Sequence, residues 1–188
     1  MPPTSGNSRR PTFRTQRLRL TWLLALPFVY LAAPSPRSLL IGALISASGL
    51  LLRGYAAGSI HKDRELATGG PYDFVRHPLY LGSFFLGFGL ALAGGRWWFP
   101  ALFFGFFAWL YAQTVRAEEK ELADRFGAAF DTYRRRVPAF LPRLRHDGFK
   151  SPSAGFRSSL YRRNKEWQAL LGAAMGYGLL WGKMFYLG

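Results

Sequence analysis

Apolar and polar residues are strongly segregated along this chain: long apolar runs carry almost no charge, and the basic residues collect between them. A helix needs about 20 apolar residues to cross the roughly 30 Å of hydrocarbon in a bilayer. Residues 97–115 contain no charged residue and begin with two tryptophans, as expected for a transmembrane helix with an interfacial aromatic belt. Four further runs are interpreted as spans: residues 20–33, 39–58, 79–94 and 167–187.

The predicted spans differ in length and in the proline and charged residues that they contain. The run over 20–33 is short and contains Pro27, which would kink a helix, so it either crosses tilted or lies partly in the interface. The run over 39–58 carries Arg53 near its end, where the long side chain can reach the interface. The run over 167–187 is interrupted by Lys183, and its many small residues would permit close helix contact.

This pattern predicts an all-α integral membrane protein with about five transmembrane helices. The first run follows five arginines and therefore also resembles a secretory signal peptide, but no convincing cleavage site follows Ala33, so we favour an uncleaved helix. The chain divides into a basic N-terminal tail, two membrane helices, a central region, a basic loop and a C-terminal membrane helix: residues 1–17, 18–58, 59–142, 143–166 and 167–188.

Composition adds a strong charge imbalance, with 25 Lys and Arg against 10 Asp and Glu, and a net charge of +15. The partner is therefore anionic, either nucleic acid or a membrane surface. With a cytoplasmic N-terminus, every basic residue lies on the cytoplasmic side except Arg37, Arg96, Lys183 and the intramembrane Arg53. This asymmetry follows the positive-inside rule. We therefore expect anionic lipid headgroups as partners, particularly of the basic loop, and no nucleic acid.

The residue types and motifs that are absent from the sequence exclude several familiar kinds of site. The chain has no cysteine, so disulfides, thiolate metal sites and cysteine nucleophiles are impossible. Its 3 histidines show no close His/Asp/Glu spacing of the zinc type, and no metal is expected. His61 and His146 are interpreted as loop residues. Walker, dinucleotide-binding and serine-hydrolase motifs are absent from the sequence.

The first segment with unusual chemistry is GGPYDFVRHPLYLG, residues 69–82. Its start predicts a turn followed by an extended portion, and Pro78 stands where a helix can begin because that position needs no amide N–H. His77 is then at or near the N-cap, and Tyr80 can share a face with His77 or with Arg76. The positive end of the helix dipole would favour a carboxylate or phosphate there, although a polar interfacial collar is an equal alternative.

The second segment is RAEEKE, residues 116–121, immediately after the fourth predicted span. Its three acidic residues would lie at a helix C-terminus, where the dipole disfavours negative charge, so a bound cation is one explanation. The other is an amphipathic juxtamembrane helix over 117–133. Its apolar stripe would consist of Leu122, Phe126, Ala129, Phe130 and Tyr133.

Together, GPYDFVRHPLYLG, a helical hairpin and RAEEKELADRFGAAFDTYRRRVPAFLP resemble the isoprenylcysteine carboxyl methyltransferase and phospholipid methyltransferase family of integral membrane enzymes. The likeness covers residues 66–142 and combines an RHPxY core, an EE pair, an FG and a VPxFLP ending in the family's order. It implies an S-adenosylmethionine-dependent methyltransferase whose cofactor pocket lies on the cytoplasmic side, formed by the third and fourth spans and the segment after them. Residues 59–142 are then the methyltransferase motif region.

Carried over position by position, the resemblance implies a set of site residues. The catalytic and substrate-side candidates are Arg76, His77, Arg116 and Glu119. The cofactor-binding candidates are Leu66, Ala67, Tyr72, His77, Pro78, Leu79, Tyr80 and Glu118. The chemistry agrees, because a sulfonium and an amino group need acidic acceptors while a carboxylate needs cationic or helix-N-terminal donors. Methyl transfer itself needs no metal, only a donor and an acceptor held close and aligned in a dry site.

The methyl acceptor stays open among a prenylated cysteine carboxylate, a phospholipid amine and a small thiol or other hydrophobic molecule. The excess of arginine over lysine hints at a GC-rich bacterial genome, hence an inner membrane, where prenylated proteins are less expected. Two other functions are alternatives. One is a membrane reductase using a nicotinamide cofactor, against which the EE pair argues; the other is a non-catalytic membrane scaffold.

Overall fold

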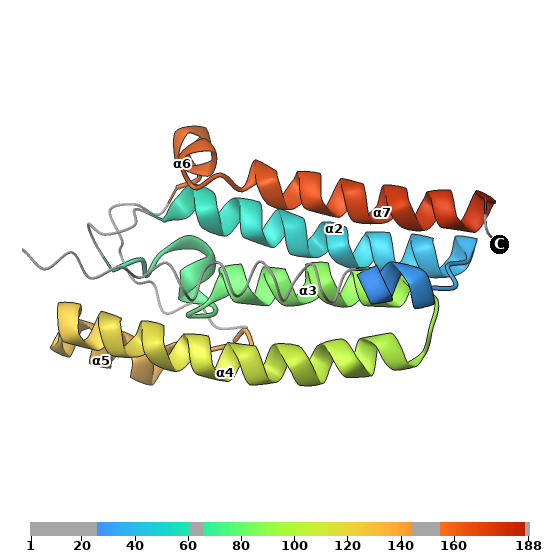
Figure 1. The fold of residues 1–188 in the computed structure, drawn as a ribbon. Helices are drawn as coiled ribbons and strands as arrows, with labels where there is room; N and C mark the ends of the chain where they lie inside the picture. The colour runs from blue at the N-terminus through green and yellow to red at the C-terminus, as the bar shows by residue number, and fades with distance from the viewer. Residues whose placement is uncertain (1–25, 61–65, 144–154, 187–188) are drawn as a thin grey trace, which may run out of the picture.

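A computed structural model of the chain describes residues 26–60, 66–143 and 155–186. The described residues form helices and turns without any strand, which confirms the all-α prediction for this part of the chain. Long helices lie side by side along the molecule (Figure 1): α2 (Pro36–Ser59), α3 (Pro78–Ala93), α4 (Trp98–Phe126) and α7 (Trp167–Tyr186). Shorter helical pieces are residues 26–31, the 3₁₀ turn η1 (Gly70–Asp73), α5 (Ala128–Arg136) and α6 (Ser158–Arg163).

Two of the described helices, α2 and α4, are long and apolar enough to cross a membrane, and α3 is apolar but shorter. Large apolar side chains such as Leu44, Leu51 and Trp109 face outward from them. An extended apolar surface of this kind suits contact with lipid. α3 and α7 coincide closely with the predicted runs over 79–94 and 167–187. The run over 20–33 lies partly outside the described residues.

Glycines bring α2 and α3 into the closest helix contact of the described chain. A Cβ atom at Gly42 would fall against the Gly89 carbonyl, and one at Gly49 would lie 2.6 Å from the Leu86 amide nitrogen. Small residues at a membrane helix interface let the backbones approach in this way. Among the small residues of 167–187, which were expected to permit close helix contact, Gly176 lies against α3, where a Cβ would be 3.2 Å from Leu90 Cδ1. Gly172 and Gly178 have no such neighbour, because a Cβ at either position would meet nothing within 4 Å.

The residues of the helix predicted over 117–133 are helical except at Gly127, but they belong to two elements, the end of α4 and α5. α4 continues without a break through Phe126, and the chain turns only at Gly127, whose φ of 51° lies in the left-handed region that favours glycine. At 1.5 Å per residue, α4 is about 43 Å long and exceeds the hydrocarbon thickness, so its charged C-terminal part projects beyond the apolar part. Glu118 and Glu119 therefore lie well inside α4 and do not oppose the dipole at its C-terminus.

Two further local expectations need correction. The turn predicted from Gly69 to Pro71 is present as η1, but it continues to Asp73 and Phe74 is also helical, so no extended portion follows directly. Pro71 favours this because its ring fixes a helical φ. The basic loop over 143–166 contains α6, whose backbone is tied to the end of α2 by a hydrogen bond from the Arg157 amide to the Gly58 carbonyl, 2.9 Å long. Residues 144–154 of that loop lie outside the described residues.

Candidate active site

The RHP motif forms the start of α3. Pro78 is the first helical residue and His77 is the N-cap, as predicted, and the amides of Tyr80 and Leu81 both donate to the His77 carbonyl at 3.1 Å. The His77 side chain is almost fully buried, with 4% of its surface exposed. The N-cap position therefore holds the imidazole inside the protein at the end of a helix rather than in a solvated collar.

The two glutamates of the EE pair have different roles because adjacent helix positions face different directions. Glu119 turns toward the RHP motif: its Oε1 lies 2.8 Å from Arg76 Nη1 and 3.1 Å from His77 Nε2. Glu118 lies 4.0 Å from His77 Nδ1 and keeps 43% of its side chain exposed. Glu119 thus fixes Arg76 and His77, whereas the Glu118 carboxylate is accessible to a ligand.

These side chains border an open pocket of about 1020 Å³, in the upper part of the size range of small-molecule and cofactor sites. Nine of the predicted residues line it: Leu66, Ala67, Tyr72, Arg76, His77, Pro78, Leu79, Tyr80 and Glu118. Arg116 is exposed and is not among the lining residues, and Glu119 stands behind His77. The structure therefore brings the predicted cofactor positions to one pocket and leaves Arg116 outside it.

Tyr72 supplies an unpaired donor within this pocket. Its side chain is 6% exposed, and its hydroxyl has no hydrogen-bond partner. Burial raises the pKa of the Tyr72 hydroxyl far above its usual range, and the nearby Tyr133, Glu118 and Glu166 raise it further. The hydroxyl therefore stays protonated at any physiological pH. A buried donor without an acceptor is costly, so this atom points to a ligand that accepts a hydrogen bond.

The segment that contains the VPxFLP ending forms hydrogen bonds with the RHP motif and with α4. The Arg76 amide donates to the Pro138 carbonyl at 2.8 Å, and the Tyr111 hydroxyl donates to the Ala139 carbonyl at 3.1 Å. Behind η1, the Tyr133 hydroxyl donates to the Tyr72 carbonyl at 2.6 Å. The predicted apolar stripe contributes here, because Phe130 and Tyr133 form a buried cluster with Val137, against which Leu122 and Phe126 pack.

An aromatic column leads from the pocket along α3 and α4 into the apolar part of the bundle. The His77 and Tyr80 rings lie 5.8 Å apart, and Tyr80 is 5.9 Å from Tyr111. Tyr111 stacks on Phe107 at 5.7 Å, and Phe107 is 5.2 Å from Phe84. A chain of ring contacts thus leads from His77 and Tyr80, which line the pocket, along the α3–α4 contact.

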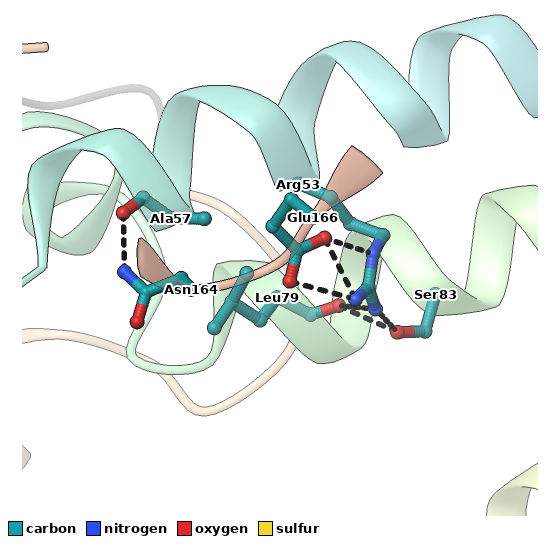
Figure 2. A network of polar contacts seen from close by, with 6 residues as sticks. All are labelled: Arg53, Ala57, Leu79, Ser83, Asn164 and Glu166. Carbon is teal, nitrogen blue, oxygen red and sulfur yellow. Dashed lines mark hydrogen bonds and ion pairs between the residues drawn. The ribbon is translucent and has the colours of Figure 1, made fainter. Parts of the chain in front are cut away.

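Sequence motifs did not predict several of the residues that line the pocket, among them Arg53 and Glu166. Arg53 was expected to extend to the membrane interface, but its guanidinium instead pairs with Glu166 across 113 positions of sequence (Figure 2). The only signal in the sequence was a lone arginine inside an apolar run, which is costly without a partner. No group of three His, Cys, Asp or Glu residues suited to a metal ion occurs among the described residues.

Comparison with known proteins agrees with this geometry. The family model for phospholipid methyltransferases matches residues 38–129, which include the RHP motif and the EE pair. Over this segment, just under half of its length, the chain is similar to the phospholipid methyltransferase family. The family resemblance seen in the sequence is thereby confirmed, and the matched region contains α2, α3, α4 and η1.

The individual relatives that the chain matches carry different names. A protein-S-isoprenylcysteine O-methyltransferase of Schizosaccharomyces pombe is 31% identical over 110 residues, 55% of this chain and 46% of that protein. Methanethiol S-methyltransferase 2 of Bradyrhizobium diazoefficiens is 41% identical over 91 residues, 43% of this chain and 32% of that protein. The nickel-cobalt-cadmium resistance protein NccN of Alcaligenes xylosoxydans xylosoxydans is 41% identical over 83 residues, 44% of this chain and 38% of that protein.

The chain spans less than half the length of each of these relatives. No solved structure matches it. The comparisons therefore support a methyltransferase associated with membranes, and the acceptor has to be argued from the pocket.

Proposed function

We propose that this protein transfers a methyl group from S-adenosylmethionine to a lipidic or small hydrophobic acceptor at the cytoplasmic face of a membrane. The observation that carries the proposal is the pocket at the start of α3, where an accessible carboxylate, an unpaired buried hydroxyl and an imidazole border the same space. The match to the phospholipid methyltransferase family model supports the reaction class.

The residues present fit the cofactor. Glu118 offers an accessible carboxylate for an amino group or ribose hydroxyls, and the Tyr72 hydroxyl is an unpaired donor for an oxygen acceptor. The start of α3 adds partial positive charge, which favours a carboxylate. When bound, S-adenosylmethionine supplies an electrophilic methyl group on a sulfonium. We assign Tyr72, His77, Tyr80 and Glu118 to holding it, with Leu66, Ala67, Pro78 and Leu79 as apolar walls.

The remaining groups orient the site and handle protons. Glu119 holds Arg76 and His77 in place, so their side chains need no reorganisation when a ligand binds. A carboxylate acceptor is already ionised at pH 7 and needs no base, whereas an amine or thiol must lose a proton. For such acceptors we assign the His77 imidazole as the proton acceptor. Arg116, exposed on α4, stays a candidate for acceptor contact at the rim.

The aromatic column supports an acceptor with an apolar body. Tyr80, Tyr111 and Phe107 extend from His77 toward the lipid-facing part of the bundle, so an apolar molecule can reach the imidazole while remaining in contact with aromatic side chains. A prenylcysteine, a phospholipid amine and a small thiol all satisfy this condition. The named activities of two relatives, on isoprenylcysteine and on methanethiol, fall within the same range.

Charge distribution supports the orientation. The pocket end of the bundle carries Arg134, Arg135 and Arg136 on α5 and Arg162 and Arg163 on α6. We propose that this end faces the cytoplasm, with the N-terminus on the same side, and that these arginines contact anionic headgroups of a bacterial inner membrane. The five-span arrangement remains part of this proposal.

The test is methyl transfer in vesicles with S-adenosylmethionine that carries a labelled methyl group. Each acceptor class is supplied in turn: a prenylcysteine analogue, phosphatidylethanolamine and a short-chain thiol. We expect label in at least one product, and roughly a hundredfold lower turnover in His77→Ala if the acceptor must lose a proton. Asp131→Asn, on the exposed side of α5, is the control. Failure of folded protein to label any acceptor, combined with binding of reduced nicotinamide cofactor, would instead favour the reductase alternative.

A further inference from the structure

Arg53 is an arginine within the apolar helix α2, and it forms an ion pair with Glu166, the residue that precedes α7. Its Nε lies 3.0 Å from Glu166 Oε2, and its Nη2 lies 3.0 Å from Glu166 Oε1 (Figure 2). Only 21% of the Arg53 side chain and 10% of the Glu166 side chain are exposed. A two-bonded pair of this kind fixes the plane of the guanidinium, because its donors form a rigid fork.

The third guanidinium nitrogen of Arg53 turns the other way, to α3. Nη1 donates to the Ser83 hydroxyl and, at 3.4 Å, to the Leu79 carbonyl. The Ser83 hydroxyl itself donates to that same carbonyl at 2.7 Å. One side chain of α2 therefore connects the start of α7 with the first turns of α3, the helix that carries His77 and Tyr80.

Glycine makes room for this connection. A Cβ atom at Gly82 would lie 2.6 Å from Arg53 Cγ, so only glycine at that position lets the arginine stem pass along α3. Glu166 is placed by its own neighbours, because the Asn164 side-chain amide donates to the Ala57 carbonyl at 2.8 Å. Both Asn164 and Glu166 lie outside the family-matched segment, which ends at residue 129.

We propose that Arg53 and Glu166 form a clasp that positions the first turns of α3, residues 78–83, as a wall of the cofactor pocket. Arg53, Ser83 and Glu166 line that pocket together with Leu79 and Tyr80, so the clasp acts where the ligand would lie. The C-terminal segment then helps to position the pocket wall through Glu166, in addition to any role in anchoring the chain in the membrane. The link to cofactor rests on the function proposed above, whereas the positioning of α3 does not.

The test separates positioning from simple attachment of α7. Glu166→Gln and Arg53→Lys weaken the clasp. The matched control is Tyr177→Phe, which removes the 2.8 Å hydrogen bond between Tyr177 and Ser46, another link between α7 and α2 that lies away from the pocket. Two quantities are measured on the full-length purified protein: hydrogen exchange of the backbone amides over 79–83 without ligand, and calorimetric affinity for S-adenosylhomocysteine.

We expect Glu166→Gln and Arg53→Lys each to speed exchange over 79–83 and to weaken S-adenosylhomocysteine binding, both by roughly tenfold. The double variant should bind S-adenosylhomocysteine with the same affinity as the single variants, because the two residues act as a unit. Tyr177→Phe should leave both quantities unchanged even if it lowers Tm.

Unchanged exchange over 79–83 in both clasp variants overturns the proposal. So does an equal effect of Tyr177→Phe, since the clasp would then only attach α7. If the wild-type protein does not bind S-adenosylhomocysteine while the clasp variants still speed exchange, the positioning role stands and the proposed function is the part that fails.

Discussion

His77 is the N-cap of α3, which places its imidazole 3.1 Å from Glu119 Oε1. This position followed from Pro78, whose missing N–H suits the first helical residue and is a local property. The division of labour between Glu118 and Glu119 did not follow, because it depends on which face of α4 meets the RHP motif. The Arg53–Glu166 pair joins positions 113 apart, and no local pattern announces such a contact.

Tyr72 gives a prediction at this scale. Unfolded tyrosine ionises near pH 10, whereas burial keeps the pKa of Tyr72 well above that in the folded protein. The stabilising effect of this difference is fully present below pH 10 and is lost as the pH rises further, because the unfolded state then gives up a proton that native Tyr72 retains. Tm should therefore fall on alkalinisation from about pH 9 to pH 11, and less steeply in Tyr72→Phe. Thermal unfolding of the wild type and of Tyr72→Phe across this pH range measures the change in Tm.

The control for this prediction replaces the exposed Tyr186 with phenylalanine. An identical alkaline slope in Tyr72→Phe and in the wild type would mean that Tyr72 is accessible to solvent when it ionises. That result would remove the argument for an unpaired buried donor in the pocket.

At the scale of helices, sequence located the elements well but misjudged their contacts and ends. The apolar runs predicted α2, α3 and α7 closely, since apolar length is a property of each helix alone. The small residues of α7 suggested close helix contact, which Gly176 makes with α3, but the tightest packing lies between α2 and α3. The break after α4 falls at Gly127, because the charged residues from Arg116 onward are good helix formers and give no reason to stop earlier.

The α2–α3 contact predicts a strong and local effect of a single methyl group. Gly89→Ala would place its Cβ against the Gly42 carbonyl and 2.7 Å from the Ser46 amide nitrogen. Overpacking of this kind costs about 1–3 kcal/mol of folding free energy, so Tm should fall. Gly172→Ala on α7 is the matched control, because its Cβ meets nothing within 4 Å. If thermal unfolding shows equal Tm values for the two variants, the helix pair is not packed through glycine.

The whole molecule assembles its pocket from segments that are distant in sequence. Residues 66–80 and the EE pair come from the family-matched part, and sequence motifs identified them because their order is distinctive. Tyr133 and Glu166 lie beyond the matched segment and join the pocket only through the fold. The site could therefore be predicted at its centre but not at its rim.

The central claim is that this pocket binds S-adenosylmethionine, and titration calorimetry with the product S-adenosylhomocysteine tests it without requiring the acceptor. We expect saturable binding by the wild-type protein and by the control Asp131→Asn. Glu118→Gln should weaken binding by at least roughly tenfold, because a hydrogen bond to a charged group contributes about 1.5–3 kcal/mol. No binding by folded wild-type protein, or unchanged affinity in Glu118→Gln, would contradict the assignment of this pocket.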